Sequence, residues 1–214
     1  MNDDNVHKGL RSQLVKVLIE KGIKDENVLN AIGKVPRHLF FDKEFQQKYA
    51  YDDIAFPIGA GQTISQPYTV AFQTSLLQVK KRSKILEIGT GSGYQAAVLC
   101  ELGAKVFSVE RQQELFEVSN HFLKKMGYNP KCFYGDGFIG REVFAPYDGI
   151  LVTCGAPYIP EPLKLQLKIN GRLVIPVGEG GTQQMKLVVR LNEDEFSEET
   201  LGAFSFVPML KNKT

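Results

Sequence analysis

The first third of the chain carries hydrophobic residues at the spacing of an amphipathic helix. Four of them share one helical face and predict a helix over His7–Lys21. A second helix is expected over Asp25–Ile32, with Asp25 as a candidate N-cap. A third is expected over Tyr68–Leu77, opened by Pro67. The residues of the first helical face are Leu10, Leu14, Val17 and Leu18.

From position 84 onward, short apolar runs alternate with helical stretches, which is typical of a parallel α/β sheet. The runs predicted as strands are 85–88, Val106–Val109, Cys132–Tyr134, Gly149–Thr153 and Leu173–Val177. The intervening helices are expected at Gln95–Leu102, Gln112–Met126 and Glu161–Leu167. A terminal hairpin is expected from Met185–Asn192 and Thr200–Phe206, joined by the charged link Glu193–Glu199. The pattern therefore predicts a parallel sheet with one antiparallel edge strand.

The glycine turn after the first of these strands indicates a cofactor site. Gly89, Gly91 and Gly93 alternate with polar residues between the apolar run and the next helix. Such a turn lets bare backbone and free N–H groups approach a ligand. The spacing Gly-x-Gly-x-Gly differs from the Gly-x-Gly-x-x-Gly of dinucleotide folds. Glu110 ends the next strand, where a carboxylate can accept hydrogen bonds from both hydroxyls of a ribose.

The stretch Phe56–Pro67 is predicted to be a long loop. Its small residues argue against a core strand, and its hydroxyl and amide groups suit a binding site. Ser65 stands out as a functional candidate, and its alternative role is the N-cap of the helix that follows. His38 lies between a proline turn and bulky apolar residues, so a structural role is favoured over that of a catalytic base.

Composition narrows the class of protein. A chain of 214 residues with 43% hydrophobic content suits one globular domain with a real core. The net charge of +2 does not favour nucleic acid or an anionic membrane as partner. The sequence shows neither a signal peptide nor an apolar stretch of membrane-spanning length. Three scattered cysteines support neither a disulfide framework nor a zinc site, so a cytoplasmic location is expected.

Several motifs together make the chain resemble the protein-L-isoaspartate O-methyltransferases along nearly its whole length. The two most discriminating are the loop Gly61-Gln62-Thr63-Ile64-Ser65-Gln66-Pro67 and the earlier Val35-Pro36-Arg37. The glycine turn, Gly135-Asp136-Gly137, Ile175-Pro176-Val177-Gly178 and Phe206-Val207-Pro208 also match. The resemblance implies a doubly wound, mostly parallel seven-stranded sheet of the class I methyltransferase type. It also implies an N-terminal helical region and a C-terminal antiparallel hairpin. Residues 1–214 would form one domain, divided into a helical and active-site region 1–83 and a cofactor-binding core 84–214.

The same resemblance implies the reaction. S-adenosylmethionine would donate a methyl group to the α-carboxylate of an isoaspartyl residue in a damaged protein, leaving S-adenosylhomocysteine. Such a carboxyl titrates near pH 3.5, roughly, and is already ionised at pH 7, so no general base is required. The expected partners are isoaspartyl proteins and peptides, with no metal, nucleic acid or membrane, and the protein is expected to be a monomer.

Site residues are carried over from the family by position. Ser65 would be the active-site residue, its hydroxyl donating to the acceptor carboxylate. Glu110 would hold the ribose hydroxyls and Asp136 the adenine amino group, while Glu87 would point to the methionine end or order the loop. The remaining cofactor-binding positions are Gly89, Thr90, Gly91, Ser92, Gly93 and Gly137, and the substrate-binding positions are Thr63, Ile64, Ser65, Gln66 and Val207.

Three other functions remain open from the sequence. An RNA methyltransferase would share the glycine turn, although such enzymes usually carry a basic surface. A nicotinamide oxidoreductase is disfavoured by the glycine spacing. A non-catalytic protein that binds the cofactor is disfavoured by the intact Thr63–Gln66 loop.

Overall fold

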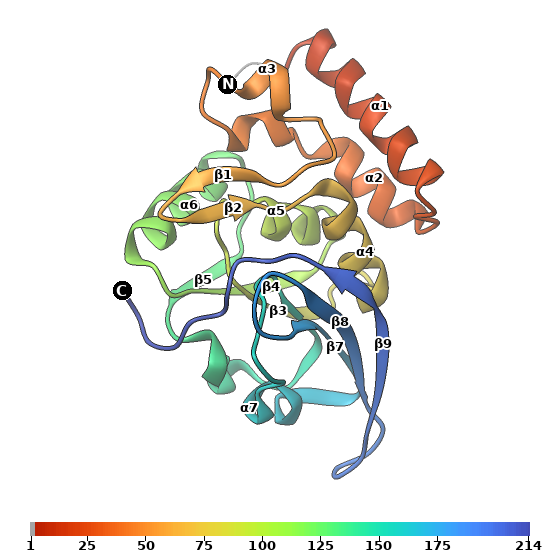
Figure 1. The fold of residues 1–214 in the computed structure, drawn as a ribbon, viewed down its shortest axis with the longest axis vertical. Coiled ribbons are helices and arrows are strands. Elements are labelled where there is room, and N and C mark those ends of the chain that lie inside the picture. The colour runs from red at the N-terminus through yellow and green to blue at the C-terminus, as the bar shows by residue number, and fades with distance from the viewer. Residues whose placement is uncertain (1–2) are drawn as a thin grey trace.

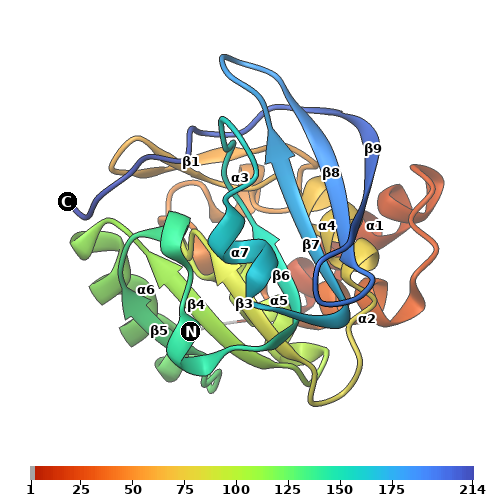
Figure 2. The same ribbon diagram turned by 90° about the horizontal axis from the view of Figure 1, so that it is seen from below.

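A computed structural model describes residues 3–214 and contains a seven-stranded sheet in the order β5-β4-β3-β6-β7-β8-β9 (Figure 1). The first five of these strands in space run parallel to one another, and β8 and β9 each pair antiparallel with their neighbour. Figure 2 shows β4 and β5 toward one end of the sheet and β8 and β9 toward the other. The strands are β3 Lys84–Ile88, β4 Lys105–Glu110, β5 Lys131–Tyr134, β6 Tyr147–Val152, β7 Leu167–Val177, β8 Gln183–Arg190 and β9 Phe196–Phe204.

Side chains alternate along the parallel strands and build a hydrophobic core on each face of the sheet. In β3, Ile85 belongs to one core and Leu86 and Ile88 belong to the other. The first core lies against the helices that precede and follow β3, and the second contains Leu163 from the opposite side. The helices and 3₁₀ turns of this region are α4 Pro67–Leu77, α5 Tyr94–Glu101, α6 Gln113–Lys125, η2 Gly137–Ile139, η3 Glu142–Phe144 and α7 Glu161–Leu165.

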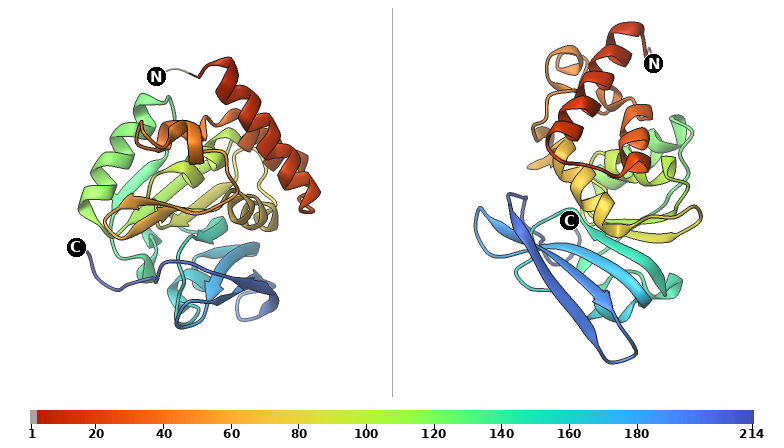
Figure 3. Two further views of the ribbon diagram at one scale, coloured as in Figure 1. Left: turned by 45° about the horizontal axis from the view of Figure 1, so that its top comes forward. Right: turned by 90° about the vertical axis from the view of Figure 1, so that its right-hand side faces the viewer.

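The N-terminal helices form a further layer on the face covered by α4 and α5, as Figure 3 shows in its right-hand view. Asp25 caps α2 as expected, because its carboxylate accepts from the N–H groups of Asn27 and Val28. Val17 differs from expectation: it lies 36% exposed, while Leu14 and Leu18 are buried. The elements of this layer are α1 Asn5–Glu20, α2 Glu26–Lys34, η1 Arg37–Phe40 and α3 Gln46–Tyr49.

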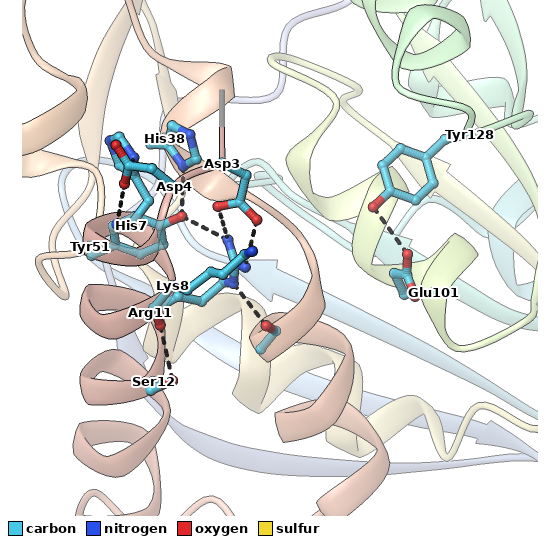
Figure 4. A network of polar contacts seen from close by, with 11 residues as sticks. Asp3, Asp4, His7, Lys8, Arg11, Ser12, His38, Tyr51, Glu101 and Tyr128 are labelled. Atoms are coloured by element: carbon cyan, nitrogen blue, oxygen red, sulfur yellow. Dashed lines mark hydrogen bonds and ion pairs between the residues drawn. The ribbon is translucent and has the colours of Figure 1, made fainter. Parts of the chain in front are cut away.

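A buried polar network ties α1 to the chain that follows α2 (Figure 4). Arg11 donates to both carboxylate oxygens of Asp3, to the carbonyl of Gly33 and to the hydroxyl of Tyr51. His38 is fully buried, with its Nδ1 2.7 Å from the Tyr51 hydroxyl and its ring stacked on that of His7 at 3.8 Å. These contacts give His38 the structural role expected of it.

The segment predicted as a long loop contains a short antiparallel hairpin, β1 Phe56–Gly59 paired with β2 Gln62–Ile64. The prediction was wrong there because the hairpin depends on tertiary contacts. Ile64 is 1% exposed in the core, and the rings of Phe56 and Phe41 lie 5.1 Å apart. At the tip, Ala60 adopts a left-handed backbone with φ of 50° between two glycines.

The C-terminal part also differs in detail from the predictions. Helix α7 ends at Leu165, and β7 begins at Leu167 rather than at Leu173. The last strand β9 begins at Phe196, inside the predicted charged link. The antiparallel strand β8 is not the edge strand, since β9 pairs along its outer side. Among residues 3–214, every helix is too short or too polar to cross a membrane.

Candidate active site

The glycine turn lies at the carboxyl end of β3, where parallel sheets bind nucleotide-like ligands. Gly89 has φ of 98°, and a Cβ placed on it would come within 2.5 Å of the Thr153 hydroxyl. Gly91 is likewise in the left-handed region, and its backbone borders the pocket. Gly89 therefore requires glycine, and both positions bring bare backbone to the edge of a cavity.

That cavity is the expected site of the cofactor, and we call it the cofactor pocket; it contains about 800 Å³ of space, including part of the open solvent. It is lined by the ends of β3 and β4, the start of α5, the strand β2 with the residue after it, and the C-terminal segment 207–210. The expected residues that line it are Thr63, Ile64, Ser65, Gly89, Thr90, Gly91, Ser92, Glu110, Gly137 and Val207.

Glu110 is placed at this pocket by β4 and fixed there by backbone groups. One carboxylate oxygen accepts from the N–H of Gly91 at 2.9 Å, and the other accepts from the N–H of Gln112 at 3.0 Å. The residue is only 5% exposed. Each carboxylate oxygen retains lone-pair capacity for a further donor, which suits the two hydroxyls of a ribose.

Ser65 precedes α4 and is held directly by one side chain that is distant in sequence, while another holds the residues that follow it. The guanidinium of Arg37 donates to the Ser65 carbonyl at 2.9 Å. On the other side, the Asp53 carboxylate accepts from the N–H of Tyr68 at 2.7 Å and from the side-chain amide of Gln66 at 3.2 Å. The N-cap of α4 is Gln66 rather than Ser65, so the alternative helix-capping role of the serine is wrong.

Ser65 also borders a second cavity, a groove of about 1250 Å³ that includes part of the open solvent. It runs between α4 and the segment 201–207 and has aromatic walls. The residues that border both this groove and the cofactor pocket are Thr63, Ser65, Thr153 and Val207. The two cavities therefore meet at the Ser65 loop. The aromatic residues of the groove are Tyr68, Phe72, Phe204 and Phe206.

Comparisons with known proteins give the family. Residues 9–214 match the family model described as protein-L-isoaspartate(D-aspartate) O-methyltransferase. The chain belongs to this family. A relative from Flavobacterium psychrophilum named protein-L-isoaspartate O-methyltransferase is 58% identical over 100% of both chains.

Two solved structures agree with the assignment. One named protein-L-isoaspartate O-methyltransferase has a TM-score of 0.85 and 29% identity, covering 94% of this chain and 66% of that chain. The other, a Plasmodium falciparum candidate for the same enzyme in complex with S-adenosyl-L-homocysteine, has a TM-score of 0.82 and 26% identity. It covers 98% of this chain and 100% of that chain.

Membership in the family confirms the predicted activity and fold class. The chain is a methyltransferase that uses S-adenosylmethionine to methylate L-isoaspartyl residues of damaged proteins. Its seven-stranded, mostly parallel sheet with a terminal antiparallel hairpin is the class I methyltransferase fold.

Four expected site residues lie outside the cofactor pocket. Glu87 is fully buried on the α5 side of the sheet and accepts from the Ser108 hydroxyl at 2.5 Å. Asp136 accepts from the N–H groups of Phe138 and Asn212, which ties the C-terminal segment to the end of β5. Gln66 borders only the second groove, and Gly93 is the N-cap of α5, where an added Cβ would meet Leu123.

Sequence reasoning assigned no role to several residues that border the pocket. Thr153 bonds the carbonyls of Ile88 and Gly89 through its hydroxyl, and Gln112 bonds the carbonyl of Ala60 at the hairpin tip. Thr153 directly follows β6, so its position at the carboxyl edge of the sheet could have predicted that it borders the pocket. Within residues 3–214, no three His, Cys, Asp or Glu side chains gather closely enough to hold a metal ion.

Proposed function

We propose that methyl transfer occurs at the Ser65 loop, with the cofactor in the glycine-turn pocket and the isoaspartyl peptide in the aromatic groove. The observation that carries this proposal is that the same loop borders both cavities. Residues 84–214 form the cofactor side, residues 1–83 supply the acceptor loop, and the whole of 1–214 acts as one domain.

The lining of the pocket fits S-adenosylmethionine. Gly89, Thr90, Gly91 and Ser92 offer backbone and hydroxyl groups to the methionine and ribose parts. Glu110 accepts from the ribose hydroxyls while its carboxylate stays anchored to the turn. Gly137 also lines the pocket, and Asp136, whose carboxylate oxygens each accept one backbone N–H, accepts from the adenine amino group in this proposal.

When bound, the cofactor supplies an electrophilic methyl group on a sulfonium sulfur. The acceptor carboxylate is already ionised at neutral pH, so the chain has only to orient it and exclude water. The Ser65 hydroxyl donates to one carboxylate oxygen and turns the other toward the pocket. Thr63, Ile64, Gln66 and Val207 position the peptide around it.

The groove suits an extended peptide of varied sequence. Its aromatic walls offer apolar contact, and the segment 201–207 beside it offers backbone groups. The proposal includes a cytoplasmic monomer without nucleic-acid or membrane partners, supported by the balanced charge and scattered cysteines. Sedimentation equilibrium measures whether the protein is a monomer in solution. An RNA methylation assay tests whether RNA is a substrate instead.

The direct test uses labelled S-adenosylmethionine and two peptides that differ only in an isoaspartyl or a normal aspartyl linkage. We expect transfer to the isoaspartyl peptide alone. Ser65→Ala should lower kcat about 10²-fold, by analogy with loss of one oriented donor. Ser75→Ala is the matched control, since its hydroxyl bonds the Ala71 carbonyl within α4 and lies away from both cavities. Full turnover by Ser65→Ala would refute the role of this hydroxyl.

A further inference from the structure

Arg37 is the least exposed charged side chain near the active-site loop. It begins the turn η1 and is 0% exposed. Its guanidinium donates to the Ser65 carbonyl at 2.9 Å and reaches the Ile54 carbonyl at 3.5 Å. The same group lies over the ring of Tyr94 at 4.6 Å and near that of Phe41 at 5.4 Å. A planar cation is thus held between carbonyls and aromatic faces.

This cation is costly to bury. Within residues 3–214 no carboxylate forms an ion pair with Arg37, and its Nε and Nη1 atoms have no hydrogen-bond partner. Burial lowers the pKa of Arg37, while the nearby Tyr94 and Asp53 oppose this shift. An apolar side chain of similar length would avoid this cost but would leave the Ser65 carbonyl without its donor. The arginine is therefore retained for what it contacts, at a cost in desolvation.

The contacts of Arg37 lead to the two sides of the reaction. The Ser65 carbonyl lies one residue before the N-cap of α4, so the helix cannot satisfy it and Arg37 does. Tyr94 is the first residue of α5, directly after the glycine turn, and borders the cofactor pocket. One rigid group therefore contacts both the acceptor loop and the wall of the cofactor pocket.

We propose that Arg37 is a positioning residue for methyl transfer: it fixes the peptide group of Ser65 relative to the start of α5. This sets the direction in which the Ser65 hydroxyl faces the cofactor pocket. Asp53 completes the arrangement by holding Gln66 and Tyr68 on the other side of the serine. The inference rests on the proposed role of Ser65, through which Arg37 acts.

Removing this contact should affect turnover far more than cofactor binding. Displacing a reacting group by about 1 Å can cost on the order of 10²-fold in rate. The groups that border the cofactor pocket from the glycine turn and β4 do not bond Arg37. We therefore expect Arg37→Met to lower kcat about 10- to 100-fold while the Kd for S-adenosylhomocysteine changes by less than about 3-fold.

The experiment compares purified full-length variants in an isoaspartyl-peptide methylation assay, with calorimetric binding of S-adenosylhomocysteine and thermal unfolding in parallel. Arg37→Lys keeps the charge without the planar stacking group, so its kcat should lie between that of wild type and Arg37→Met. Arg37→Lys also keeps the test possible if Arg37→Met folds poorly. Arg11→Met is the matched control: Arg11 is a buried arginine of the same layer that bonds Asp3, Gly33 and Tyr51 but not the Ser65 loop. It should lose stability and keep its kcat.

A double-mutant cycle separates positioning from general damage. If Arg37 acts through Ser65, the double variant Arg37→Met, Ser65→Ala should turn over within about 2-fold of Ser65→Ala alone. Two losses that multiply would overturn the inference, as would wild-type kcat in Arg37→Met or a loss of cofactor affinity that matches the loss of kcat. Wild-type kcat in Ser65→Ala would instead refute the proposed role of the serine itself. Wild-type kcat in Arg37→Met beside an impaired Ser65→Ala refutes only the inference about Arg37.

Discussion

The difference in unfolding free energy between Glu87→Gln and wild type should move in favour of the glutamine variant as the pH rises from 5 to 8. Glu87 is fully buried, and burial raises its pKa from 4.5 to about 8. The hydrogen bond from Ser108 opposes this shift, and the negative charge of Glu110 adds to it. Near neutral pH the folded protein therefore keeps a proton on Glu87 that the unfolded chain has released.

The sign and size of the effect follow from proton linkage. Where the folded state binds more protons than the unfolded state, the free energy of unfolding falls as the pH rises. With pKa values of 4.5 unfolded and about 8 folded, the contribution of Glu87 is fully present below pH 4.5 and is lost as the pH rises toward 8. The loss between pH 5 and pH 7 amounts to about 2.5 kcal/mol.

Glutamine has the same shape and stays neutral. It can accept from Ser108 in the same way, and its amide nitrogen replaces Oε1, the oxygen of Glu87 that has no hydrogen-bond partner within residues 3–214. Urea unfolding of both proteins at pH 5, 6, 7 and 8 measures the difference in unfolding free energy, so that titrating groups shared by the two proteins cancel. Glu179→Gln, in an exposed loop, is the matched control. A difference that stays constant within about 0.5 kcal/mol from pH 5 to pH 7 would contradict a raised pKa at this site.

Three further variants test the cofactor pocket and the helix propensities. Glu110→Ala should raise the Kd for S-adenosylmethionine, because the ribose acceptor and the anchor of Gly91 are both lost; unchanged binding by calorimetry would refute the ribose role. Gly89→Ala should destabilise the fold by about 2–4 kcal/mol, since φ of 98° and the Thr153 hydroxyl both oppose a Cβ. Gly9→Ala, at an exposed position of α1 with no atom near the new Cβ, should instead stabilise it by about 0.5–1 kcal/mol in the same urea assay.

Glu87 shows how tertiary structure decides a role that the motif alone leaves open. Its place beside the glycine turn suggested a cofactor contact. Register pairs Glu87 with Ser108 on β4, and strand alternation puts both on the α5 side of the sheet, away from the pocket. Thr90, which does border the pocket, is connected to Glu87 only through the Ser108 hydroxyl.

The hairpin β1–β2 and the first part of strand β9 show that local sequence can fail to predict a strand. Both segments contain small or charged residues that local propensity assigns to loops. They become strands because a neighbouring strand satisfies their backbone groups, β2 for β1 and β8 for β9. The energy of strand pairing depends on the partner strand, so the sequence of one segment says little about whether that segment forms a strand.

The sequence by itself determined the alternation of strands and helices, the glycine turn after β3 and the family, because each depends on residues close together in the chain. Only the tertiary structure decided which of the marked residues meet. It brings Ser65 within reach of Arg37 and sets Val207 beside Thr63 at the junction of the two cavities. It also buries Glu87 in the core and places the Asp136 carboxylate where it accepts from the N–H of Asn212 in the C-terminal segment. The physical reason is that these contacts join positions tens of residues apart, and packing of the whole sheet and its helices sets their geometry.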